Sequence, residues 1–242
     1  MASHFSDIGF VFNNQGDMEA YLSSIFDKGK EIPSKNGFYR LVTVDSSIEL
    51  WFSGKRKILS RKEIITGIEL HYKSETVIPV RFGHWINPKD DSNYEAMVLH
   101  DNGTEIPFVV NIPNAYMYRD IKEGEAMRLQ VACFAEELQL YDTEEEYFSS
   151  QEKEPRFAAE SFLPTGAFNL GKSETTAAAA LSGHIIHFEK RINSHTGCGY
   201  YLFSVACLGA VYTILADVSL VDKQPRLGGI LQGSFWVSGK PL

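Results

Sequence analysis

Strand-like blocks that recur in the second half of the chain constrain its fold most strongly. From Thr66 onward, apolar and polar residues alternate with the period of two that is typical of strands. The block "TGIELHYK" matches "SGHIIHFEK", because each has a Gly followed four positions later by a His, His71 or His187. Two further blocks recur in the same order: "YEAMVLHDNGTEIPFVV" with "YYLFSVACLGAVYTILA", and "IKEGEAMRLQVACFA" with "PRLGGILQGSFWVSG". The pattern therefore predicts two copies of one β module.

The order of these blocks is a strand, a loop, a hairpin, a connector and a long strand. This order resembles the OB-fold, a partly open five-stranded barrel. The resemblance covers Gly67–Tyr141 and Gly183–Lys240 and concerns the fold alone, since no diagnostic residue string accompanies it. It implies that the hairpin strands and the first long loop of each module contact ligands, as in barrels that bind oligonucleotides or oligosaccharides.

The first 66 residues have a mixed pattern that predicts a small α+β unit. "DIGFVF" is expected to be a strand, and "NNQGDMEAYLSSIFDKGK" a helix that Asn14 or Asp17 caps and Gly29 ends in the left-handed conformation. "GFYRLVTV" and "SSIELWFSG" then alternate like a hairpin.

The fold class that follows is mainly β, with a small α+β N-terminal unit and two repeated OB-like β-barrel modules. The predicted organisation is a β-α-β-β unit at 1–66, a first OB-like module at 67–141, a linker or wrapping segment with a short helix at 142–182, and a second OB-like module at 183–242. Asp142 or Thr143 is expected to cap the short helix.

Composition disfavours several classes of function. The net charge is −8, and the best basic cluster, Gly54–Lys62, is outweighed by acidic stretches, so nucleic acid is a disfavoured partner. Three cysteines without a secretion signal are typical of a cytoplasmic protein, and no apolar run is long enough to span a membrane.

The stretch "GAFNLGKS" matches the phosphate-loop pattern G-x-x-x-x-G-K-[ST]. Its candidate nucleotide-binding residues are Gly166, Gly171, Lys172 and Ser173. The pattern requires a buried strand before it and a long helix after it. Pro164 interrupts the preceding segment, and the Ala-rich segment that follows favours a helix but offers little apolar surface. We therefore expect the match to be coincidental.

The histidine and cysteine residues do not form a convincing metal-binding or catalytic pattern. His184, His187, His195 and Cys198 resemble zinc ligands, but His184 and His187 lie three apart on a strand and are expected to face opposite ways. We predict no metal site and no cofactor. Cys133 and Cys207 lie within apolar strands, where cysteine is an inert small hydrophobe. With no coherent catalytic set, we expect a protein that is not an enzyme.

Two groups of residues are candidates for ligand binding. The first lies in the loop and hairpin of the second module, and comprises Arg191, His195, Tyr200, Tyr201 and Phe203. These aromatic rings could stack on bases or sugars, or they could fill the core or the junction between modules. Alternation predicts that Tyr200 and Tyr201 face opposite sides, so that one of them lies inside.

The second group is Trp51 and Glu49 on the N-terminal hairpin. A regular strand places Glu49 on the side of Trp51, either in a junction or pocket or facing water. We prefer the hairpin whose Glu faces water.

The sequence leads to one favoured function and one alternative. The favoured function is a cytoplasmic, non-enzymatic binding or protein-interaction module whose partner is another protein or a small ligand. The alternative is single-stranded nucleic-acid or oligosaccharide binding through the barrel faces, and a nucleotide-binding protein is the third possibility.

Overall fold

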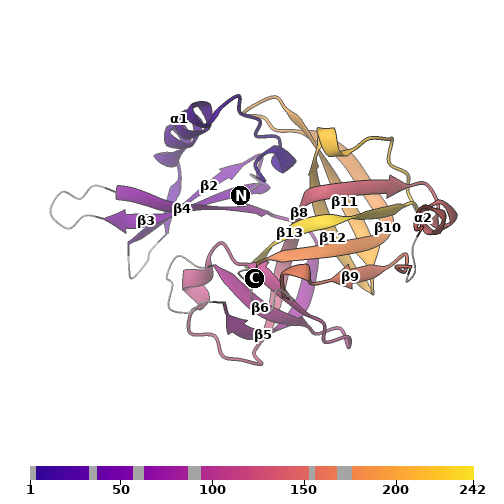
Figure 1. Cartoon of the computed structure of the whole chain (residues 1–242). Coiled ribbons are helices and arrows are strands. Elements are labelled where there is room, and N and C mark those ends of the chain that lie inside the picture. The colour runs from indigo at the N-terminus through magenta and orange to yellow at the C-terminus, as the bar shows by residue number, and fades with distance from the viewer. Residues whose placement is uncertain (1–3, 33–36, 57–62, 87–93, 153–155, 168–175) are drawn as a thin grey trace.

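The computed structural model describes residues 4–32, 37–56, 63–86, 94–152, 156–167 and 176–242, and these form a mainly β protein with a small helical N-terminal part. Helix α1 precedes a four-stranded antiparallel sheet in the chain and lies beside it (Figure 1). Its elements are α1 (Gln15–Phe26), β1 (Lys30–Ile32), β2 (Phe38–Val44), β3 (Ile48–Arg56) and β4 (Glu63–Tyr72).

The capping residue and the hairpin in this region were predicted correctly. The Asn14 side chain accepts a hydrogen bond from the Asp17 backbone N–H and so begins α1, and β2 and β3 pair as an antiparallel hairpin. Two predictions were wrong. α1 ends at Asp27 in a right-handed conformation, without a left-handed Gly29. The stretch "DIGFVF" forms no strand: its first two residues belong to the 3-10 helix η1 (Ser6–Ile8), and Gly9 has a φ of 76°.

The remaining strands form one nine-stranded sheet that closes on itself twice. Its elements are β5 (Val77–Trp85), β6 (Glu95–His100), β7 (Pro107–Asn111), η2 (Ala115–Tyr118), β8 (Ala126–Tyr141), α2 (Glu144–Ser150), β9 (Ser161–Leu163), η3 (Thr165–Ala167), β10 (Ala178–Ile192), β11 (Gly199–Cys207), β12 (Ala210–Asp217), η4 (Val218–Leu220) and β13 (Ile230–Pro241). As predicted, the Thr143 side chain caps α2 by accepting from the Glu146 N–H.

Two long strands, β8 and β13, pair antiparallel from Ile230–Tyr141 at one end to Pro241–Leu129 at the other. We call this pair the central ribbon. At one end, β5 joins the edge of β8 and β7 joins the edge of β13, and β6 connects them to close the first barrel. At the other end, β12 joins β8 and β10 joins β13, and β11 closes the second barrel. Each barrel thus has five strands, of which the ribbon supplies two.

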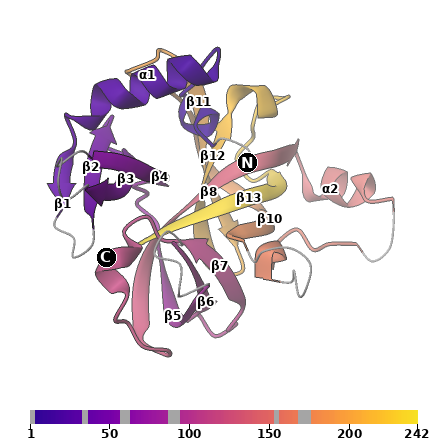
Figure 2. The ribbon, with the colours of Figure 1, turned by 60° about the vertical axis from the view of Figure 1, so that its left-hand side comes forward.

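The two barrels share one apolar core. Side chains on one face of β8, from Met127 to Leu140, lie in a single cluster with residues of both barrels. The opposite face of the ribbon carries Ala132, Phe134 and Trp236, which pack against the four-stranded sheet. Full burial of one large apolar side chain contributes about 1.5–3 kcal/mol, so the ribbon is stabilised from both sides. Figure 2 shows the ribbon running between the four-stranded sheet and the strands β5–β7.

The first predicted pair of repeated blocks does not occupy equivalent places. β4 pairs with β3 in the four-stranded sheet, whereas β10 is a barrel strand. The shared barrel position predicted for His71 and His187 is therefore wrong, because His71 is buried beside the ribbon and His187 is exposed. In the first barrel, β5 pairs with β8 and β6 as β10 pairs with β13 and β11. The sequence repeat itself and its domain boundaries stay predictions.

Candidate functional site

A groove of about 470 Å³ lies on the outer side of the central ribbon, where β8 contains a bulge. The ladder passes from Ser234–Glu137 to Phe235–Ala135 and leaves Glu136 without an opposite residue. The extra residue brings two acidic side chains to the same stretch of surface. The groove is lined by Glu136, Glu137, Leu138, Gln139, Ala180, Leu220, Gln232, Gly233 and Ser234.

The groove carries acidic and polar side chains, while most of its exposed lining surface is apolar and small residues line part of it. Glu136, Glu137 and Gln139 are exposed on β8, and Gln232 and Ser234 are partly exposed on β13. These side chains offer two carboxylates, two amides and a hydroxyl, and none of the nine lining residues is Lys or Arg. Gly233 is required here, because a Cβ at this position would lie 2.2 Å from the Glu137 carbonyl oxygen.

The sequence could not have identified this groove with confidence. Its polar residues come from β8 and β13, which are distant in sequence, and only the pairing register brings them together. Two signals were present: a Gly within the last strand, and the pair Glu136–Glu137, which interrupts the alternation of β8.

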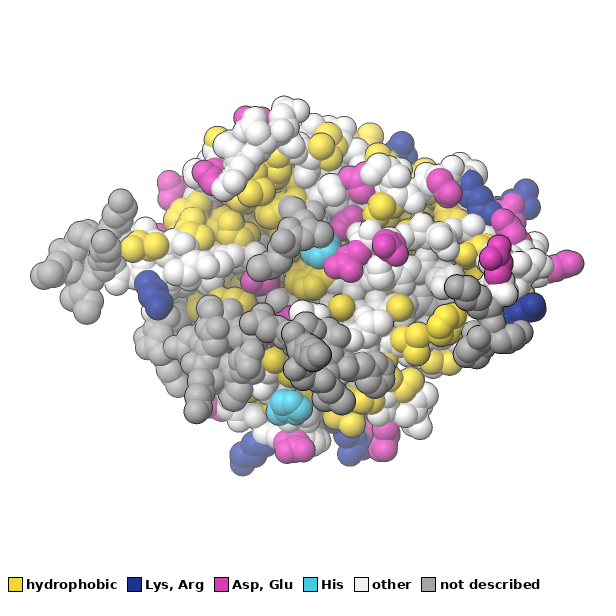
Figure 3. Space-filling model, viewed as in Figure 1, with side chains coloured by type: hydrophobic (Ala, Val, Ile, Leu, Met, Phe, Trp, Pro, Cys, Tyr) yellow, Lys and Arg dark blue, Asp and Glu magenta, His cyan; other side chains and the backbone are white. Residues whose placement is uncertain are grey.

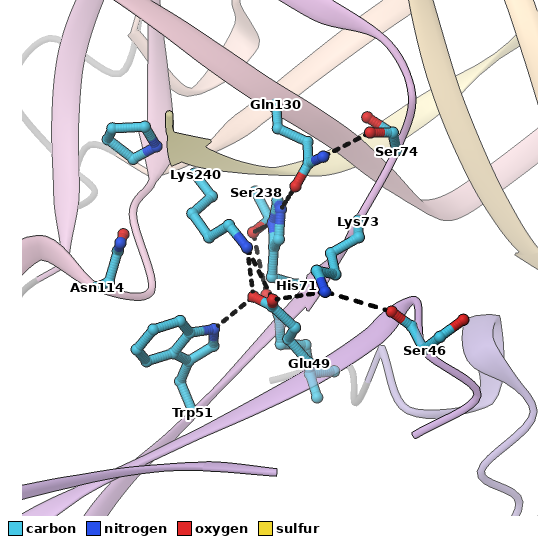
Figure 4. A network of polar contacts seen from close by, with 12 residues as sticks. Ser46, Glu49, Trp51, His71, Lys73, Ser74, Asn114, Gln130, Ser238 and Lys240 are labelled. Carbon is cyan, nitrogen blue, oxygen red and sulfur yellow. Dashed lines mark hydrogen bonds and ion pairs between the residues drawn. The ribbon is translucent and has the colours of Figure 1, made fainter. Parts of the chain in front are cut away.

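A second polar cluster, the polar seam, lies between the four-stranded sheet and the ribbon (Figure 4). The sheet contributes Glu49, Trp51, Glu69 and His71, which share one face of β3 and β4. Facing them are Asn111 on β7, Gln130 on β8, and Ser238 and Lys240 on β13. The seam joins strands that belong to both predicted modules and to the N-terminal unit.

Glu49 is the most buried ionised group of the seam. It is 2% exposed, and the Lys240 ammonium donates to both of its oxygens at 2.7 and 2.9 Å. The Trp51 indole N–H donates to Glu49 Oε2 at 2.9 Å, and Lys73 lies 3.9 Å away. The preferred interpretation of the hairpin was therefore wrong: Glu49 lies in a junction and does not face water.

His71 and Ser238 form a hydrogen bond that resembles part of a nucleophilic site. His71 Nδ1 lies 3.0 Å from Ser238 Oγ, which also donates to the Leu70 carbonyl oxygen at 3.0 Å. Both residues are 0% exposed, so a substrate has no access to this hydroxyl. Burial lowers the pKa of His71 to about 4, in spite of the nearby Glu49. The pair is a structural contact of the seam.

The ligand-binding residues predicted in the second barrel are divided between the barrel core and the junction with the N-terminal unit. Tyr200 and Phe203 are buried, and Tyr201 is partly buried and stacks on Phe203. Tyr200 faces the N-terminal unit and Phe203 the barrel core, as alternation requires. Arg191 pairs with Glu189 at 2.5 Å and donates a hydrogen bond to Tyr72. The aromatic rings fill the core and the junction in this structure.

The N-terminal segment packs against the loop at 193–198, which joins β10 to β11. Asn193 Nδ2 donates to the Ile8 carbonyl oxygen at 2.8 Å, and the Thr196 hydroxyl donates to that of Gly9 at 2.5 Å. His195 Nδ1 lies 2.7 Å from the Tyr21 hydroxyl of α1. His195 is nevertheless exposed, and the role of these residues in binding stays a prediction.

The two histidines of strand β10 do not face opposite ways as the sequence predicts. A bulge at Ile186 places His184 opposite Ala206 and His187 opposite Ser204, so the two imidazoles face the same way, contrary to the prediction. His184 lies 3.3 Å from Glu144, and His187 lies 3.9 Å from Glu189. Within the described residues, no three His, Cys, Asp or Glu side chains gather in a metal-binding arrangement.

Of the candidate nucleotide-binding residues, only Gly166 lies within the described part of the chain, since Gly171, Lys172 and Ser173 fall outside it. Gly166 is part of η3, and a Cβ there would lie 1.9 Å from the Thr176 carbonyl oxygen. The Ala-rich segment enters strand β10 at Ala178, so the helix favoured by its composition is wrong. The first described element after the motif is therefore a strand, whereas a phosphate loop is followed by a helix.

Burial raises the pKa of the Cys133 and Cys207 thiols to about 12, which is typical of unreactive core cysteines.

Among the described residues, no helix is long and apolar enough to cross a membrane. Comparison with protein-family models, with curated proteins and with solved structures finds no match to this chain.

Proposed function

We propose that this chain is a non-enzymatic binding protein whose partner occupies the groove on the central ribbon. The observation that supports the proposal most directly is the lining of the groove, which gathers polar side chains from β8 and β13. Concave sites with a few converging polar groups are the usual places for ligands. Beneath the groove, Leu138 and Leu231 pack into the apolar core, which supports the shape of its floor.

The chemistry of the lining favours a cationic partner over an anionic one. Glu136 and Glu137 place two negative charges on the groove, and the amides of Gln139 and Gln232 offer further acceptors. Phosphates would be repelled, and the described Lys and Arg side chains are scattered over the face drawn in Figure 3 rather than gathered in one patch. A Lys- or Arg-bearing segment of another protein therefore fits the groove best, in a cytoplasmic setting that reduced cysteines favour.

A labelled lysine-rich peptide at low ionic strength tests the proposal, with fluorescence anisotropy as the readout. Exposed ion pairs contribute about 0.2–1 kcal/mol each. The double variant Glu136→Gln/Glu137→Gln should therefore weaken binding roughly 2- to 30-fold. Ser234→Trp, which fills the groove without changing its charge, should weaken binding as well.

The matched control is Glu145→Gln/Glu152→Gln, which removes the same charge from exposed positions outside the groove. This control should bind the peptide almost as tightly as the unmodified protein. Equal losses in the two double variants would mean that net charge alone attracts the peptide and would refute the groove as its site. Tighter binding of single-stranded oligo-dT or of an oligosaccharide than of the peptide would support the alternative function.

A further inference from the structure

One hydrogen bond of the polar seam joins the four-stranded sheet to the first barrel. Asn111 Nδ2 on β7 donates to Glu69 Oε2 on β4 at 2.9 Å. Glu69 lies opposite Trp51 on β3, and Asn111 lies opposite Ser238 on β13. The two side chains therefore meet where the sheet, the first barrel and the central ribbon come together.

The side-chain amide of Asn111 also has a buried oxygen to which no described group donates a hydrogen bond. Asn111 is 7% exposed, and its Oδ1 has no hydrogen-bond partner among the described residues. Such an orphaned group costs about 1–3 kcal/mol. An ionised Glu69 offers acceptors alone and cannot supply the missing donor, whereas a protonated carboxyl has one O–H. A neutral Glu69 can thus both accept from Asn111 Nδ2 and donate to Asn111 Oδ1, in a cyclic acid–amide pair.

The charges around Glu69 favour its neutral form. Glu95 on β6 is the nearby acid, and its Oε1 accepts from the Ala177 N–H at 2.9 Å. Tyr94, just before β6, is a second facing group. On the other side, Lys240 of β13 is held by Glu49 of β3, and His71 of β4 is buried. Among the described residues, no cation forms an ion pair with Glu69.

We propose that Glu69 and Asn111 form a proton-dependent latch that holds the four-stranded sheet against the first barrel. The latch is closed when Glu69 carries a proton and the cyclic pair forms. It is weakened when Glu69 is ionised, because the Asn111 oxygen then loses its donor and a charge is left in the seam.

The pKa of Glu69 lies near neutral pH. Burial raises the pKa of Glu69 to about 7, the Asn111 hydrogen bond opposes this rise, and Glu95 adds to it. Because the folded pKa is raised above the ordinary value near 4.3, the stabilisation is complete below about pH 4.3. It decreases as the pH rises and is lost above about pH 7.

The test compares the unmodified protein with Glu69→Gln in urea denaturation between pH 5 and pH 8.5. Glutamine mimics the protonated acid, since it can donate to Asn111 Oδ1 and accept from Asn111 Nδ2 at every pH. The unfolding constant of the unmodified protein should rise roughly 80-fold between pH 5 and pH 8.5 relative to that of the variant, for a folded pKa of about 7 and an unfolded pKa near 4.3. Glu75→Gln, an exposed change just beyond β4, should follow the unmodified protein.

A direct readout on the unmodified protein keeps the test independent of variant folding. Carbon-13 NMR of the Glu69 carboxyl should show titration with a midpoint near 7. The protection factors of the β4 and β7 amides, which correct hydrogen-exchange rates for their intrinsic rise with pH, should fall above that pH. A midpoint near 4.3, or the same pH dependence of stability in Glu69→Gln as in the unmodified protein, would overturn the proposal. Neither result depends on whether the groove binds a peptide.

Discussion

Glu49 and Lys240 show how one ion pair couples parts of the molecule that lie far apart in sequence. Glu49 belongs to the N-terminal hairpin, and Lys240 lies on the last described strand, β13. With side chains only 2% and 13% exposed, neither charge can be solvated if its partner is removed. A buried pair adds little net stability, but a single uncompensated member is very costly. Loss of either member therefore disfavours the packing of the sheet on the ribbon.

The variant Lys240→Met leaves Glu49 buried without its main cation, and we expect a loss of about 3–5 kcal/mol in the free energy of unfolding. Adding Glu49→Gln should recover most of that loss, since glutamine removes the charge and still accepts from the Trp51 indole. Urea denaturation of the single and double variants measures both effects. A loss of less than about 1 kcal/mol for Lys240→Met would show that water reaches this carboxylate.

The sequence placed Glu49 on the side of Trp51 correctly, because that relation depends only on the alternation of a regular strand. It could not show that this side is buried, since the covering residue, Lys240, lies almost two hundred positions away. An acidic side chain on a short hairpin more often faces water, and burial here depends on tertiary packing. Local pattern sets the direction of a side chain, whereas its environment is set by contacts distant in sequence.

At the scale of elements, the N-terminal segment and the loop at 193–198 behave as one unit. Asn193 is 0% exposed, donates to the Ile8 carbonyl and accepts from the His195 N–H at 2.9 Å. A second contact comes from Asp7, which accepts from the Asp217 N–H at 3.1 Å. These bonds satisfy backbone groups of a segment that has little regular structure of its own.

The variant Asn193→Ala should release this segment. It removes two hydrogen bonds and leaves the buried Ile8 carbonyl without a donor, at a cost of about 1–3 kcal/mol. Limited proteolysis should then cleave the chain near the start of α1 faster than in the unmodified protein. The control Ser194→Ala keeps its backbone bond to Asp45 and should leave the cleavage rate unchanged. Equal rates for all three proteins would contradict this account of the segment.

Element types were predictable where local rules determine them. Asn14 and Thr143 cap helices because their side chains satisfy nearby N–H groups, and the β2–β3 hairpin follows from alternation. The placement of β4 was not predictable, because its pattern suits a sheet edge as well as a barrel strand. The groove was missed for a related reason, since the Glu136 bulge has meaning only once β8 is paired with β13.

At the scale of the whole molecule, the central ribbon makes the two barrels interdependent. The first barrel needs β13 to reach β7, and the second needs β8 to reach β12. Each predicted module therefore borrows a long strand from the other. The four-stranded sheet packs on the outer face of the same ribbon, so its packing depends on the pair as well.

Truncation from Gly229 onward should abolish soluble expression, because it removes β13 from both barrels and Lys240 from the seam. Removing Leu242 alone, which is 64% exposed, should leave the fold intact. In the full chain, tryptophan fluorescence and far-ultraviolet circular dichroism should report one coincident unfolding transition. A truncated protein that stays folded and monomeric, or two separated transitions, would show that the barrels stand alone.

The late position of β13 in the sequence also limits when the barrels can close during synthesis. Because β13 follows every other described strand in the chain, neither barrel can close while the protein is still being synthesised up to that point. The edges of β7 and β10 that β13 will cover stay open until then, and open strand edges are places where chains associate wrongly. We therefore expect the nascent chain either to be bound by chaperones or to fold rapidly once β13 has been synthesised.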